Sequence, residues 1–220
     1  QKFEKSRFTR VDSDVIDRLI VKEEHKEANL ESNQREILSS VFRSQLPQIK
    51  KVEFNVETQA LGENGAPIMI TQSEYMRRMK EMANIQAGMS FYGEMPNMYN
   101  LVLNADHKLV KQVLTDADNS CKAALEPIES EMANLNNRRK ELQKAQEGKK
   151  TEDIPQAEKD ELNDIEKKIS DETTKKQAVL GEYANGNKII HQLIDLALLQ
   201  NNMLKGEALT NFVKRSIELI

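Results

Sequence analysis

Side chains that could support acid–base, metal or nucleotide chemistry are sparse in this sequence and stand apart from one another. His107 has no nucleophile or metal ligand at a useful spacing, which disfavours a catalytic role. Asp12, Asp14 and Asp17 lack further ligand types nearby, and the first two suit a helix N-cap better than a cation site. The turn from Gly62 to Gly65 lacks the Lys-Ser/Thr that completes a phosphate-binding loop. We therefore expect no catalytic residue, no metal ligand and no cofactor site in these 220 residues.

The composition indicates a polar protein without a charge bias toward nucleic acid. The chain holds 32 Lys and Arg against 36 Asp and Glu, a net charge of −4, and 38% of its residues are hydrophobic. Such balance argues against a nucleic-acid binder, and no apolar run approaches the roughly 20 residues that span a bilayer. The single cysteine, Cys121, excludes an internal disulfide and suits a reducing cytoplasm. We expect a cytoplasmic chain with no nucleic-acid or membrane partner and, because it opens at Gln1, a piece of a longer protein.

Charge is concentrated in one segment, which predicts an extended helical protrusion. Residues 116–176 carry 12 Lys and Arg and 16 Asp and Glu but no aromatic residue. Apolar residues recur there at helical spacing on both sides of a polar break from Gly148 to Pro155: Cys121, Leu125, Ile128, Met132, Leu135 and Leu142, then Leu162, Ile165 and Ile169. This pattern predicts an antiparallel coiled-coil hairpin, with Pro127 either kinking the first helix or marking its start. Its role is open between a solvated spacer and a partner-binding arm.

The remaining periodicities predict an α+β fold of small mixed sheets with packed helices. Alternation from Val52 to Val56 indicates a strand, and short apolar runs at 68–70 and 98–103 indicate two more. A helix is expected over 37–42, and Asn104 with Asp106 begins another.

Seven of the nine methionines lie between Met69 and Met98. Within this run, Ser73 to Gln86 reads as a capped helix whose apolar stripe is built from methionines. Such a stripe is either ordinary core or an adaptable binding surface, because thioethers repack easily around dissimilar partners.

Two short, strongly apolar helices end the chain and are candidates for self-association. They can dock on their own domain, or they can pair with a second copy as a four-helix bundle that buries both faces. We favour the second arrangement, because so polar a chain offers little apolar surface to receive them. The predicted interface residues are Ile189, Ile190, Leu193, Ile194, Leu196, Ala197, Leu209, Phe212, Val213 and Ile217.

Four motifs, in order along the chain, carry a family resemblance: Arg10-Val11-Asp12-Ser13-Asp14, Ser73-Glu74-Tyr75-Met76-Arg77-Arg78-Met79, the run from Met95 to His107, and Gly206-Glu207-Ala208-Leu209. In these motifs the chain resembles the bacterial ninety-kilodalton heat-shock proteins. The resemblance divides it into the end of a middle domain (1–30), the α/β part of a C-terminal domain (31–115), a charged insertion (116–180) and dimerisation helices (181–220).

The resemblance implies a homodimeric, ATP-driven chaperone that binds unfolded client proteins. It implies client contacts on the methionine helix at Tyr75, Met76, Met79 and Met82. The ATP and magnesium sites of the family lie in upstream domains, so this segment is expected to be no enzyme by itself. A scaffold whose charged hairpin binds partners remains the alternative.

Overall fold

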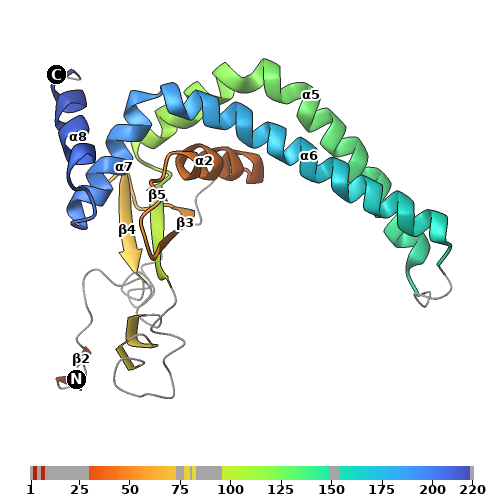
Figure 1. Ribbon diagram of the computed structural model, residues 1–220, viewed down its shortest axis with the longest axis horizontal. Helices are drawn as coiled ribbons and strands as arrows, with labels where there is room; N and C mark the ends of the chain where they lie inside the picture. Colours follow the sequence, from red (N-terminus) through yellow and green to blue (C-terminus); the bar gives the residue numbers. More distant parts are fainter. Residues whose placement is uncertain are drawn as a thin grey trace.

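The structure is a computed structural model that describes residues 2–3, 6–7, 30–72, 77–79, 81–82, 96–148 and 154–218. Within these residues the chain is α+β, as predicted: a small sheet with helices against one face continues into two long helices (Figure 1). At the N-terminus β1 (Lys2–Phe3) pairs antiparallel with β2 (Ser6–Arg7). The prediction of a helix cap at Asp12 and Asp14 lies outside the described residues.

The central sheet has three strands in the order β3–β5–β4. β5 (Asn97–Asn104) lies between β3 (Val52–Gln59), which is parallel to it, and β4 (Ile68–Gln72), which is antiparallel. Alternate side chains of the three strands point to one face and are buried there: Val56, Ile68, Ile70, Leu101 and Leu103. The three predicted strands are thus confirmed.

The turn between β3 and β4 is organised by Asn104 at the end of β5. The Asn104 side chain is fully buried; it accepts a hydrogen bond from Leu61 N (3.1 Å) and donates to the carbonyls of Gly62 (2.9 Å) and Ala66 (3.2 Å). A Cβ added at Gly65 would lie 2.8 Å from the Leu61 carbonyl oxygen. The glycine is therefore required by close backbone approach, as the absence of a phosphate-loop signature suggested.

Two helices cover the apolar face of the sheet and form the main core with it. α2 (Ser32–Ser44) contributes Ile37, Leu38, Val41 and Phe42, none more than 1% exposed. α7 (Lys188–Gln200) begins at Asn187, whose side chain accepts hydrogen bonds from the amides of Ile189 and Ile190. The core therefore joins segments that are more than 140 residues apart in the sequence.

The charged segment forms two long helices that run side by side in opposite directions and project away from the sheet (Figure 1). α5 (Lys108–Gln146) and α6 (Gln156–Gly186) are joined by ion pairs such as Arg138–Glu161 at 2.7 Å. Pro127 lies inside α5, so the alternative that it marks the helix start is wrong. Supercoiling of the pair stays a prediction. We call residues 116–148 and 154–180 of this pair the arm.

The helix boundaries do not coincide with the segment boundaries drawn from the sequence. α5 runs unbroken through residue 116, and α6 runs unbroken past residue 180. At the root of the arm, Leu125 and Leu180 belong to the same buried cluster as the sheet and α2. The arm is therefore a continuation of core helices.

Candidate functional site

Exposed apolar side chains gather on the C-terminal helices. In the described part of the chain, five large hydrophobic residues are exposed. Four of them lie on α7 and α8 (Glu207–Glu218), at Leu196 (38%), Leu199 (37%), Val213 (48%) and Ile217 (69%). The fifth is Met82, at 45%. Large exposed apolar residues on neighbouring elements are typical of interaction surfaces.

The predicted interface residues fall into three groups by burial. Ile190, Leu193, Ile194 and Ala197 are at most 4% exposed and pack in the main core of their own chain. Three others are half-buried against this core, namely Ile189, Leu209 and Phe212, while Leu196, Val213 and Ile217 are exposed. The exposed three, together with Leu199, which the prediction omitted, are the residues free to meet a partner. Self-association itself stays a prediction.

Polar bonds attach α8 to α7. Arg215 pairs with Asp195 and its Nε donates to Gln192 Oε1 at 3.2 Å. Gln192 also donates to Ser216 Oγ at 2.7 Å. Near the ends of the two helices, Lys188 donates to Glu218 at 2.8 Å, and this bond lowers the pKa of the Glu218 carboxyl below its ordinary value. Asp195, Gln192, Arg215 and Ser216 thus form one hydrogen-bonded network between α7 and α8. The Lys188–Glu218 pair lies near the ends of the same two helices.

The methionine helix is described at residues 77–79 and 81–82, all of them helical. Met79 is half-buried and Met82 is exposed, while Arg77 pairs with Glu81 along the same helix. Of the predicted client-binding residues, Tyr75 and Met76 lie outside the described residues. The exposed thioether of Met82 is compatible with a binding surface, so the methionine stripe is at least partly outside the core.

Of the residues considered for chemistry, Asp12, Asp14 and Asp17 lie outside the described residues, and His107 has a structural role. His107 precedes α5 as its N-cap, and its Nδ1 accepts a hydrogen bond from Leu109 N at 3.2 Å, so the cap lies one residue beyond the predicted Asp106. Cys121 is buried in the root of the arm, and burial raises the pKa of its thiol. Across the residues the structure describes, no three His, Cys, Asp or Glu side chains group as metal ligands. In the same residues no helix is long and apolar enough to cross a membrane.

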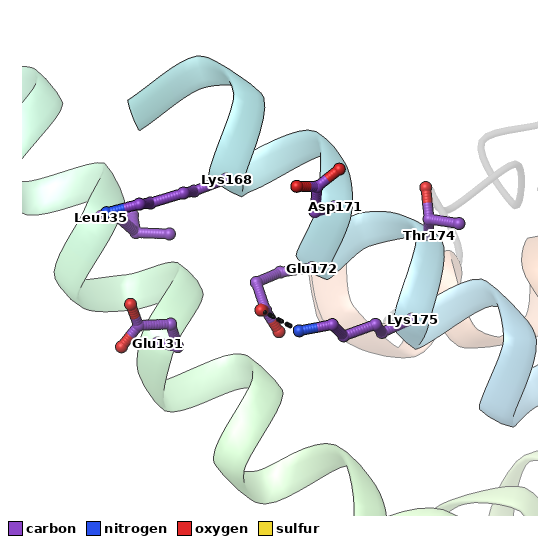
Figure 2. A pocket seen from close by; sticks show the side chains of 7 residues that line it. All are labelled: Glu131, Leu135, Lys168, Asp171, Glu172, Thr174 and Lys175. Carbon is purple, nitrogen blue, oxygen red and sulfur yellow. Dashed lines mark hydrogen bonds and ion pairs between the residues drawn. The ribbon is translucent and has the colours of Figure 1, made fainter. Parts of the chain in front are cut away.

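A groove of about 590 Å³ lies between the two helices of the arm (Figure 2). Its walls are formed by Glu131, Leu135, Lys168, Asp171, Glu172, Thr174 and Lys175. Lys175 and Glu172 already pair with each other at 2.6 Å. With mixed charge and a single apolar wall residue, the groove presents no matched set of groups for one class of ligand.

The chain is similar in sequence to bacterial proteins that are named as chaperones. It is 69% identical over all 220 residues to the chaperone protein HtpG of Bacteroides fragilis and 66% identical to that of Bacteroides thetaiotaomicron. The HtpG of Porphyromonas gingivalis is 45% identical over 222 residues. No protein-family model and no solved structure matches the chain. The chain spans 32% of the length of these relatives, and because the identity runs through all of it, we conclude that it belongs to the HtpG chaperone family.

Proposed function

We propose that this chain is the C-terminal dimerisation and client-contact region of an ATP-dependent chaperone that assists protein folding in the cytoplasm. ATP and magnesium would bind in other parts of the full-length protein, and this region would contribute assembly and client contact. The observation that carries the proposal is the placement of four of the five exposed large hydrophobic residues on α7 and α8. Its partners would be a second copy of the chain and unfolded or partly folded proteins.

Self-association is supported by the exposed apolar side chains of α8. Val213 and Ile217 are four residues apart and therefore lie on one stripe of α8. Ile217 is 69% exposed, although burying such a side chain fully is favourable by about 1.5–3 kcal/mol. Two copies related by a twofold axis would bury this stripe twice. Tethering two chains here would raise the effective concentration of the upstream domains for each other.

Client contact is supported by the methionine helix. Met82 presents a flexible, polarisable side chain to solvent, beside the charged residues Arg78 and Glu81. A surface of this kind binds dissimilar apolar segments because the thioether changes rotamer at little energetic cost. That property suits a protein whose clients share no sequence.

Sedimentation equilibrium of the 220-residue chain tests the assembly role. We expect a dimer that Ile217→Asp converts to a monomer, because the carboxylate would have to be buried in the interface. Met82→Glu is the matched control: it also places a carboxylate on an exposed apolar position, but it lies outside the C-terminal helices and is expected to leave the dimer intact. A monomeric wild-type chain, or a dimer that persists in Ile217→Asp, contradicts the assembly role.

Client contact is tested by fluorescence anisotropy with a carboxymethylated, permanently unfolded polypeptide. The double variant Met79→Glu/Met82→Glu is expected to weaken its binding, while Ile217→Asp retains the intrinsic affinity per chain. Equal affinity in the wild type and the methionine variant would remove the client role from this helix.

A further inference from the structure

α8 differs from α2, α5, α6 and α7 in how it is held. α2, α5, α6 and α7 each bury several side chains, whereas no residue of α8 is fully buried. Of its apolar residues, the half-buried Leu209 and Phe212 pack against the main core. Apolar packing alone therefore holds α8 weakly against α7.

Apolar packing also does not specify which side of α8 faces α7. Phe212 and Ser216 lie on one stripe of α8. Val213 and Ile217 each follow one of these residues, so they lie on an adjacent stripe about 100° away. A roll of α8 by that angle would exchange the stripes and bury Val213 and Ile217 on α7. The surface proposed for self-association would then be lost within the single chain.

Polar bonds distinguish the two rotations. Arg215 bonds both Asp195 and Gln192, and Gln192 bonds Ser216, so these partners can meet only in the observed rotation. The side chains of Arg215 and Asp195 are only 18% and 20% exposed, which strengthens the pair relative to one in open solvent. A shielded polar group is also a known way to specify one packing arrangement among several of similar apolar burial.

We infer that Arg215 is a positioning residue that sets the rotation of α8 on α7 through Asp195 and Gln192, and so holds Val213 and Ile217 outward for a second copy of the chain. The inference rests on the proposed self-association. Arg215 acts before assembly, within one chain: by ordering the helix in advance it lowers the ordering cost of dimerisation.

The test compares Arg215→Met with Lys214→Met in the 220-residue chain. Both variants remove one positive charge from α8, but Lys214 is exposed and takes no part in the polar bonds between the two helices. We expect Arg215→Met to weaken dimerisation roughly tenfold, the effect of losing hydrogen bonds to a charged group. Lys214→Met should leave the dissociation constant within about twofold of the wild type. The charge reversal Asp195→Arg/Arg215→Asp should recover most of the loss, which a general destabilisation would not allow.

A second readout keeps this inference separable from the proposed function. Hydrogen exchange of the α8 amides, measured at a concentration where the chain is monomeric, should be faster in Arg215→Met than in Lys214→Met. If Ile217→Asp breaks the dimer while Arg215→Met keeps wild-type affinity, the positioning role is overturned and the self-association stands. If Ile217→Asp leaves assembly unchanged, the proposed function fails, and unchanged α8 exchange in Arg215→Met overturns the positioning role as well.

Discussion

The arm and the C-terminal helices are both antiparallel helix pairs, but they treat their apolar residues differently. In the described part of the arm no large hydrophobic side chain is exposed, and its outer half has its own buried cluster of Leu135, Leu142 and Ile165. In the α7–α8 pair, one helix buries its apolar stripe in the main core and the other leaves Val213 and Ile217 in solvent. The arm thus shields its large apolar side chains from solvent within one chain, whereas the C-terminal pair leaves some of them exposed.

This difference bears on which pair needs a partner. A highly charged helix pair is often taken for a binding arm. In the arm of this chain, however, the charged residues surround apolar side chains that are already buried between α5 and α6. The C-terminal pair is shorter, yet it keeps exposed the side chains whose burial would be most favourable. On this argument the proposed assembly uses the C-terminal pair, whose apolar burial is incomplete, and not the longer and more charged arm.

The largest expected effect tests whether the buried cluster of Leu135, Leu142 and Ile165 stabilises the arm as a core does. Ile165→Ala should lower the free energy of unfolding by about 2–5 kcal/mol, because Ile165 is 6% exposed and its loss leaves a cavity. Ile217→Ala removes the same atoms from a residue that is 69% exposed and should change the stability of the monomer by about 0.5 kcal/mol or less. Urea unfolding followed by circular dichroism at low protein concentration measures both. Equal losses would erase the distinction between the two pairs.

A smaller effect is expected at the root of the arm, where Lys176 occupies a core position. Its side chain is 6% exposed and its Nζ lies 3.1 Å from Glu36 of α2 and 3.2 Å from Glu129 of α5. Lys176→Met should lower the free energy of unfolding by about 1–2 kcal/mol. The loss is smaller than for a fully buried ion pair, because the carboxylates of Glu36 and Glu129 remain partly solvated. Lys175→Met, at an exposed neighbour, is the control and should be nearly neutral.

For Lys176 the measurement is thermal unfolding together with hydrogen exchange in α2 and α6. A loss of protection confined to these helices would show that the lysine joins the arm to the core. A variant as stable as Lys175→Met would show that apolar packing at the root suffices without the charge.

The smallest effects concern one carboxylate in each pair. Glu161 accepts a hydrogen bond from Arg138 across the arm, and Glu218 accepts one from Lys188 across the C-terminal pair; each bond lowers the carboxyl pKa below its ordinary value of 4.5. Because the folded pKa is depressed, each contribution to stability is complete above pH 4.5 and is lost as the pH falls through the lowered value. Nuclear magnetic resonance titration should find both pKa values below 4.5, and the Glu218 pKa should rise toward 4.5 in Lys188→Met. A Glu218 pKa that is unaffected by the lysine would show that this bond does not form in solution.

Much of the secondary structure could be predicted from local patterns. The alternation at Val52 to Val56 and the spacing from Cys121 to Leu142 each predicted the right element, because such periodicity reflects one buried face. The cap of α5 was misplaced by one residue, since Asp106 instead accepts a hydrogen bond from Gly62 N, and Asn104 turns inward to bond the same turn before β4. A short polar side chain near a helix start has the same appearance in sequence whether it caps the helix or supports a distant loop.

The candidate surface was predicted only in outline. Sequence reasoning placed it on the C-terminal helices but could not separate Ile190 and Ile194, which are buried in the core, from Val213 and Ile217, which are exposed. It could not find the ion pairs of the buried Lys176, because the partners Glu36 and Glu129 are distant in sequence.

The sequence by itself determined which segments are amphipathic, where the charged arm lies and to which family the chain is related. These properties are local or additive along the chain, so they can be read from residue types and spacing. Only the tertiary structure decided which apolar stripe is covered, because coverage depends on the element that packs against it. A hydrophobic pattern shows that a face avoids water, but whether the same chain or a second one supplies the cover is set by the packing of the whole fold.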